Sequence, residues 1–327
     1  MTVGAPLVRA EGLSRSFTRG GRLLGRGVPL LAVQNIDFAI RRGEAVGVVG
    51  ESGCGKSTLG RLLLRLLPPS NGRVLFEDAD LATLSHAKLR RLRRRMQMVF
   101  QDPYASLDPR RSVGAQIADG LTVHRLVAPK DAADRVAALL RQVQLDPSYA
   151  ARLPHQFSGG QRQRVAIARA LATQPDFVVA DEPVSALDVS VQAQIVNLLA
   201  DLRSELGLAL VFISHDLHVV RHLCDRIVVM YLGRIVEQGP ARAVFDAPAH
   251  PYTRALLAAT PSLHRRVRTA PLAGELPSAS KPPSGCVFRT RCPDARPRCA
   301  DAVPQLEPAS GDGTRQVACW RNGEPTA

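Results

Sequence analysis

The stretch Gly50-Glu51-Ser52-Gly53-Cys54-Gly55-Lys56-Ser57-Thr58 decides the fold of this chain. An apolar run, residues 45–49, precedes it and a leucine-rich run, residues 59–64, follows, so the order is strand, glycine-rich loop, helix. This is the context that a G-x-x-x-x-G-K-[S/T] phosphate-binding loop requires. Its glycines let the backbone wrap closely round a phosphate, and the N–H groups of the loop and helix end attract negative charge. We therefore expect Lys56 to reach the β and γ phosphates of a nucleotide and Ser57 to bind Mg²⁺.

Polar side chains at the ends of three further predicted strands complete a candidate nucleotide site. Asp181 and Glu182 follow an apolar run; we expect Asp181 to hold Mg²⁺ and Glu182 to orient or deprotonate the attacking water. Gln101 ends a short strand, residues 96–100, and is placed to touch the Mg²⁺ or the water. His215 follows the strand 208–213 and can donate to the γ-phosphate. Each is a weak signal alone and gains its weight from the phosphate-binding loop.

A second anion-binding sequence, Ser158-Gly159-Gly160-Gln161, opens another predicted helix, with Ser158 as its N-cap. One phosphate-binding loop already serves the nucleotide of this chain. We therefore expect this sequence to serve the nucleotide of another subunit, which implies a dimer with two shared sites.

Strands that alternate with helices indicate an α/β sheet. Residues 102–174 are predicted to be helix after helix, including a helix that starts near Pro129, and we interpret them as an inserted helical subdomain. The glycine- and arginine-rich run 19–29 is expected to be a loop. From about residue 247 the composition changes, and prolines such as Pro261, Pro271 and Pro283 are expected to break regular structure.

The 327-residue chain carries a formal net charge of +14, which admits nucleic acid, an anionic membrane face or an acidic partner. The densest basic run, residues 88–95, has leucines at helical spacing and predicts an amphipathic helix with a solvated basic face. Aromatic residues make up 4% of the chain and do not alternate with the basic ones, so nucleic acid is not an expected partner. We find no apolar run long enough to span a membrane and no apolar N-terminal signal segment, so we expect the protein to remain in the cytoplasm.

Four of the six cysteines, Cys286, Cys292, Cys299 and Cys319, lie close together at the end of the chain. In a protein expected to be cytosolic, such clustering favours metal binding over disulfides. The spacing C-x5-C-x6-C-x19-C matches neither common zinc sites nor compact ferredoxin sequences. Four thiolates can hold Zn²⁺ or an iron–sulfur cluster, and free thiols are the third interpretation.

Taken together, these sequences resemble those of the ATP-binding-cassette (ABC) ATPases. Residues 50–58 match Walker A, Gln101 the Q-loop, Ser158–Gln161 the family signature, Val178–Glu182 Walker B, Ser185–Asp188 the D-loop and His215 the switch histidine. Phe17 stands where the family places an aromatic that stacks on adenine. The resemblance implies a RecA-like P-loop core with an antiparallel β subdomain and the inserted helical subdomain, over residues 1–246. It also implies that ATP is sandwiched between two subunits, with Asp188 and the signature of one facing the phosphate-binding loop of the other.

A closer resemblance is to the oligopeptide/dipeptide importer ATPases. It rests on residues 50–56, Phe100–Leu107, His250–Thr253 and Gly285–Pro293, and Cys54 within the loop favours the second of their two ATPase subunits, the F type. It implies a Cys-rich C-terminal extension over residues 247–327 and a [4Fe–4S] cluster there, with Zn²⁺ as the alternative. The implied partners are a second homologous ATPase subunit, two membrane permease subunits and an external substrate-binding protein. The implied location is the cytoplasmic face of the cell membrane.

Three other functions stay open from the sequence. An importer ATPase for nickel or another solute would share all these residues, because the permeases and the binding protein choose the substrate. A non-transport ABC ATPase, in DNA repair or phosphonate breakdown, agrees with the basic charge but not with the absence of a long coiled coil. A regulatory protein with a dead site disagrees with the intact Lys56, Glu182 and His215.

Overall fold

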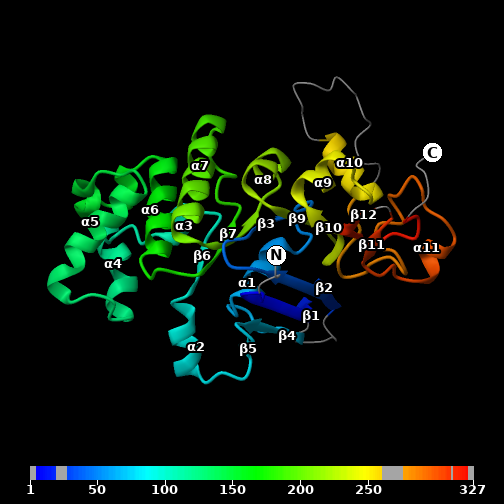
Figure 1. Cartoon of the computed structure of the whole chain (residues 1–327), viewed down its shortest axis with the longest axis horizontal. Coiled ribbons are helices and arrows are strands. Elements are labelled where there is room, and N and C mark those ends of the chain that lie inside the picture. The colour runs from blue at the N-terminus through cyan, green and yellow to red at the C-terminus, as the bar shows by residue number, and fades with distance from the viewer. Residues whose placement is uncertain (1–4, 20–27, 260–274, 311, 323–327) are drawn as a thin grey trace. The chain divides into compact units, whose positions relative to one another are not determined.

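The computed structural model describes residues 5–19, 28–259, 275–310 and 312–322 (Figure 1). The chain forms two compact units, each assembled from separate segments: residues 1–7, 40–45 and 76–213 in one, and residues 8–39, 46–75 and 214–327 in the other. We call the first the helical unit and the second the phosphate-loop unit. Most of the loop expected over residues 19–29, and the prolines Pro261 and Pro271, lie outside the described residues.

Strand β3, Ala45–Val49, forms the buried centre of the phosphate-loop unit, and all five of its residues are buried. It pairs in parallel with β9, Arg226–Tyr231, so that Val48 faces Val228. The chain then turns at Leu232 and Gly233 into β10, Arg234–Pro240, which pairs antiparallel with β9. The continuous apolar sequence of β3 is what a strand covered on both faces requires, and this strand delivers the chain into the phosphate-binding loop.

The C-terminal segment adds strands to the same sheet, in the order β11-β12-β10-β9-β3. Strand β12, Asp312–Val317, pairs antiparallel with both β10 and β11, Glu307–Ala309. No strand was predicted over residues 307–317, and neighbours on the sheet supply the backbone partners of β12. Pro283, by contrast, lies in irregular chain, as expected. The unit also holds a sheet in the order β2-β1-β4, with β2 Val28–Ile40, β1 Val8–Arg19 and β4 Asn71–Phe76. Its helices are α1 Lys56–Leu63, α8 Leu217–Leu223, α9 Ala241–Asp246, α10 Pro251–Ala259 and α11 Arg298–Asp301.

The helical unit contains three parallel strands in the order β6-β7-β8, with bounds β6 Met96–Val99, β7 Phe177–Asp181 and β8 Ala209–Ile213. Val99 faces Ala180, and Asp181 faces Ile213. Parallel strands present their carboxyl ends at one edge, so the residues that follow β6 and β7 become neighbours. Two residues form the short strand β5, Ala79–Asp80.

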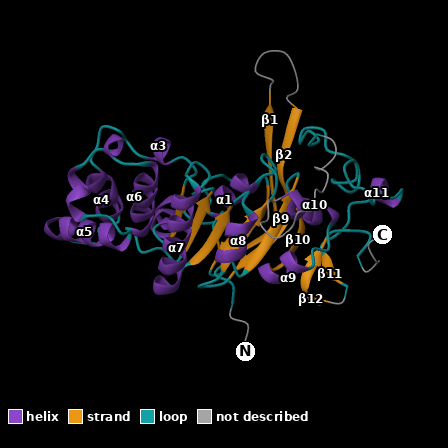
Figure 2. Cartoon of the chain, turned by 90° about the horizontal axis from the view of Figure 1, so that it is seen from above, coloured by secondary structure: helices purple, strands orange, loops and turns teal. Residues whose placement is uncertain are grey.

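The predicted helix-after-helix segment is confirmed within this unit (Figures 1 and 2). A 3₁₀ turn, Pro129–Asp131, precedes α5 and carries the proline in its first turn, as expected near Pro129. Most of the basic run lies in α2, His86–Arg93, which buries none of its described residues, so the basic side chains of this helix are solvated as predicted. Arg95 lies beyond the helix and pairs with Glu77 and Asp176. The remaining helices are α3 Pro103–Ser106, α4 Val113–Val123, α5 Ala132–Gln142, α6 Gly159–Leu171 and α7 Val189–Leu206.

Within the described residues, every helix is too short or too polar to cross a membrane.

Candidate functional site

The phosphate-binding loop, residues 50–58, links β3 to α1 and takes a conformation that only glycine allows at two positions. Gly50 has φ 150° and Gly55 has φ 107°. A Cβ at Gly55 would lie 2.1 Å from the carbonyl oxygen of Ala32, and one at Gly50 would lie 2.2 Å from the carbonyl oxygen of Met230. The loop can lie this close to the neighbouring backbone because Gly50 and Gly55 have no side chain, as the sequence predicted.

Lys56 begins α1 and is 4% exposed. Its ammonium group donates to the carbonyl oxygen of Gly50 over 2.8 Å and to that of Glu51 over 3.0 Å. The cation thus lies across the start of its own loop, held by two carbonyl groups. Gly55 occupies the N-cap position of α1 without a side chain to cap the helix, so the first N–H groups of the helix face the loop.

The ends of β6 and β7 bring two of the predicted catalytic residues together. The amide Nε2 of Gln101 donates to Oε2 of Glu182 over 3.0 Å. Glu182 has φ 45°, a left-handed backbone that costs a non-glycine residue about 1–3 kcal/mol. Its N–H donates to the carbonyl of Ile213, which ends β8. Asp181, the residue before it, is 2% exposed. The helical unit therefore places the Gln101 amide and the Glu182 carboxylate in contact at the carboxyl ends of β6 and β7. The buried Asp181 carboxylate precedes Glu182 in the chain.

The Ser158–Gln161 sequence forms a capping box at the start of α6. The N–H of Gln161 donates to the Ser158 hydroxyl over 3.3 Å, and the N–H of Ser158 donates to the Gln161 side chain over 3.0 Å. The predicted N-cap at Ser158 is confirmed. Asp188 is the N-cap residue of α7 and is exposed.

His215 and Phe17 lie in the phosphate-loop unit. His215 is exposed just before α8, where Asp216 caps the helix by accepting from the N–H groups of His218 and Val219. Phe17 is half-buried on β1, and the Arg15 guanidinium lies 4.8 Å from the centre of its ring. This unit thus holds the phosphate-binding loop, His215 and Phe17. The helical unit holds Gln101, Asp181, Glu182, Asp188 and the Ser158–Gln161 sequence.

The four C-terminal cysteines line one small pocket of the phosphate-loop unit, together with His250 and Asp294. The N–H of Cys286 donates to the carbonyl of Cys299 over 2.8 Å, which closes the chain around the pocket. Burial raises the pKa of Cys286 and Cys319 and raises that of Cys292 to about 11. Without a cation, these three thiols are therefore stable in the neutral form.

The fit of a metal to this pocket is incomplete. Among the described residues, no group of three or more cysteine, histidine or carboxylate side chains is arranged so that it could hold a metal ion. The pocket gathers the right donor atoms in one place, and all four cysteines are free of disulfides. The side chains therefore supply the chemistry of a thiolate site without its geometry.

Two residues that the sequence did not single out contact the phosphate-binding loop. Arg291 lies with its Nη1 2.8 Å and 3.1 Å from the two carboxylate oxygens of Glu51. The Tyr252 hydroxyl accepts from the N–H of Glu51 over 2.8 Å. Both residues lie in sequences that resemble the importer ATPases. The sequence did not reveal their role, because each contacts Glu51 from about 200 residues further along the chain.

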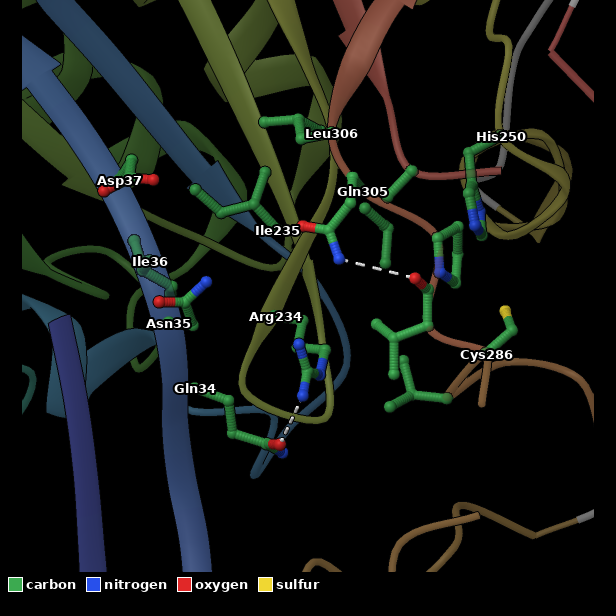
Figure 3. A pocket seen from close by; sticks show the side chains of 15 residues that line it. Gln34, Asn35, Ile36, Asp37, Arg234, Ile235, His250, Cys286, Gln305 and Leu306 are labelled. Atoms are coloured by element: carbon green, nitrogen blue, oxygen red, sulfur yellow. Dashed lines mark hydrogen bonds between the residues drawn. The ribbon is translucent and has the colours of Figure 1, made fainter. Parts of the chain in front are cut away.

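A larger cavity, of about 160 Å³, lies between β2, β10 and the C-terminal segment (Figure 3). Nη2 of Arg234 donates to the Gln34 side chain over 3.1 Å at one end. His250 and Cys286 line this cavity as well as the cysteine pocket.

Comparison with protein families gives two matches. Residues 33–185 match the model described as ABC transporter, and residues 236–299 match the model described as oligopeptide/dipeptide transporter, C-terminal region. The first range contains the phosphate-binding loop, Gln101, Ser158–Gln161 and Glu182. The second contains Tyr252, Arg291 and three of the four clustered cysteines.

Individual proteins agree with the family models. A Brucella ovis protein described as a peptide import ATP-binding protein is 52% identical over 303 residues, which cover 92% of this chain and 94% of that protein. The oligopeptide transport ATP-binding protein AppF of Bacillus subtilis is 49% identical over 293 residues, 88% of each chain.

Among solved structures, a dimer of the ATP-binding cassette MJ0796 with ADP and Pi is similar with a TM-score of 0.65 and 30% identity. The match covers 72% of this chain and 99% of that one. CbiO1 from Clostridium perfringens, part of an ABC transporter complex, gives a TM-score of 0.64 at 30% identity, with 75% and 92% of the two chains covered.

Proposed function

The chain belongs to the ABC-transporter ATPases of the peptide importer family and hydrolyses ATP to power such an importer, and we propose that its nucleotide site works as follows. The phosphate-binding loop holds the phosphates, with Lys56 on the β and γ groups. His215 donates to the γ-phosphate, and Phe17 stacks on the adenine. The observation that carries the proposal is the Gln101–Glu182 contact, which sets a carboxylate and an amide at the end of adjacent strands.

Glu182 is the group we propose to orient the attacking water and take its proton. The hydrogen bond from Gln101 orients one oxygen of this carboxylate. Ser57, Asp181 and Gln101 would hold Mg²⁺, which neutralises charge on the phosphates when it is bound. The carboxylate, amide and hydroxyl oxygens of these residues are donors that Mg²⁺ prefers.

A second ATPase subunit completes the proposed site. Ser158–Gln161 and Asp188 of this chain would face the nucleotide of the partner, because α6 presents N–H groups of its first turn there. We propose a heterodimer with a homologous ATPase, in line with Cys54 in the loop, which favours the F-type subunit.

The assembly we propose is a peripheral one at the cytoplasmic face of the membrane. Two permease subunits would dock on the helical unit near α3, where Tyr104 is 65% exposed. An external substrate-binding protein would deliver di- or oligopeptides to the permeases. We also propose the division of the chain into a nucleotide-binding domain, residues 1–246, and a C-terminal extension, residues 247–327.

We further propose that the extension carries a [4Fe–4S] cluster on Cys286, Cys292, Cys299 and Cys319, with Zn²⁺ as the alternative occupant. The gathering of the four thiols in one pocket supports this. The raised pKa values of Cys286, Cys292 and Cys319 without a metal do not oppose it, because a bound cation favours the thiolate. When present, the cluster would tie the segment together.

The test of the proposed function is peptide uptake by the complete importer in proteoliposomes, with ATP supplied on the side of the membrane that carries this subunit. Uptake and ATP hydrolysis should both require the subunit, and both should disappear with Lys56→Ala. ATP hydrolysis without peptide uptake, but with uptake of nickel or another solute, would keep the ATPase and replace the substrate.

A further inference from the structure

The side chains of three residues hold Glu51, and two of these come from the C-terminal segment. Its carboxylate accepts from Arg291, its N–H donates to the Tyr252 hydroxyl, and its carbonyl accepts from Lys56. Glu51 is the second residue of the phosphate-binding loop. Its position therefore sets where the loop turns and where the Lys56 ammonium rests.

Arg291 is itself rigidly placed. Its side chain is 7% exposed, and its N–H donates to the carbonyl of Phe288 over 3.0 Å. Phe288 is fully buried and packs with its ring centre 5.2 Å from that of Tyr231 and 5.4 Å from that of Tyr252. Because an aromatic cluster fixes both Arg291 and Tyr252, the two residues hold Glu51 as one structural element.

We propose that Arg291 and Tyr252 are positioning residues for the phosphate-binding loop, and that the C-terminal segment thereby sets the affinity of this subunit for ATP. The proposal rests on ATP binding at this loop. A loop held in its binding conformation loses less conformational freedom when the phosphates enter, so the intact contacts favour binding. Neither residue touches the reacting atoms.

The proposal also gives the cysteine pocket a connection to the nucleotide. Cys292 directly follows Arg291 and lines the pocket with the other three cysteines. A change that loosens the turn from Cys286 to Arg291 would move the Arg291 guanidinium off Glu51. ATP affinity would then report on the state of the cysteines.

Binding of a fluorescent ATP analogue with Mg²⁺ to the full chain tests the proposal. Arg291→Gln should weaken binding about tenfold, equivalent to about 1.4 kcal/mol, and Glu51→Gln should do the same. The double variant should be no weaker than either single one, because both remove the same contact. Arg291→Lys, which keeps a cationic donor, should recover most of the affinity. Arg242→Gln is the matched control, because Arg242 is 92% exposed and its loss removes the same charge.

A merely structural role would give a different result. Arg291→Gln would then lower the melting temperature without nucleotide and leave the affinity of the folded protein at the wild-type value. That outcome, or additive losses in the double variant, would overturn the proposal. If the wild-type chain fails to bind the analogue at all, it is the proposed nucleotide site that fails. Cys292→Ser should weaken binding in the wild-type background and add nothing to Arg291→Gln.

Discussion

Gln101 donates to Glu182 over 3.0 Å, across the ends of two neighbouring parallel strands. The two residues are separated by 81 positions in the chain, and their contact lies inside a single compact unit. An amide that holds one carboxylate oxygen restricts the rotation of the side chain. A proposed general base requires such a fixed orientation toward the attacking water.

The Glu182→Gln variant should retain ATP binding and lose turnover. The amide keeps the size of the carboxylate but cannot accept the proton of the attacking water, so the hydrolysis rate should fall at least about 100-fold. ATP hydrolysis by the assembled importer and nucleotide binding measure the two effects. Glu205→Gln, an exposed position on α7, is the control and should hydrolyse normally. Near wild-type turnover in Glu182→Gln would remove this residue from the mechanism.

The Gly55→Ala variant should bind no ATP and should be destabilised by about 2–4 kcal/mol. The new methyl group would lie 2.1 Å from the Ala32 carbonyl oxygen, at φ 107°, so the loop would have to move. Denaturant unfolding and nucleotide binding test this. Gly313→Ala is the matched control, because no atom lies within 4 Å of the added Cβ and the φ angle of Gly313 is not positive. A stable Gly55→Ala protein with normal affinity would contradict the described loop conformation.

Protein prepared without oxygen should contain about four irons and four sulfides per chain, with the broad visible absorption of a [4Fe–4S] cluster. Cys292→Ser should lose this absorption, whereas Cys224→Ser should keep it, because Cys224 directly follows α8 and does not line the cysteine pocket. Elemental analysis and the visible spectrum give the result. One zinc per chain would assign the pocket to Zn²⁺, and metal-free protein would reject both occupants.

Acidification should destabilise the protein through His250. Burial lowers the pKa of His250 to about 3, and its Nδ1 accepts from the N–H of Tyr252 over 3.0 Å. Between pH 6.5 and pH 3 the unfolded chain therefore binds a proton that the folded chain does not, so stability falls as the pH falls. The slope should reach about 1.4 kcal/mol per pH unit.

Denaturant unfolding at pH 7.0 and 5.5 measures this loss of stability. His250→Gln should lose less stability than the wild type over this range, whereas the exposed His86→Gln should lose as much as the wild type. Equal losses in all three proteins would show that His250 does not titrate on unfolding. The position of His250 beside the cysteine pocket makes metal-free protein the right material for the comparison.

The sequence by itself determined the nucleotide-binding part of this protein. The apolar run 45–49, the glycines at 50 and 55 and the lysine at 56 define a strand, a loop and a helix through local chemistry alone, and each was found where predicted. The capping box at Ser158 was readable for the same reason, since all its hydrogen bonds join residues at most three positions apart.

Only the tertiary structure decided how the C-terminal segment is used. No strand was predicted over residues 307–317, yet β12 gains backbone partners from β10, because a strand at a sheet edge offers unpaired groups to any segment that reaches it. The contacts of Arg291 and Tyr252 with Glu51 span about 200 residues, so neither periodicity nor spacing carries them. Residues whose contacts lie a few positions away can be identified from the sequence. Residues that contact a distant loop can be identified only from the folded chain.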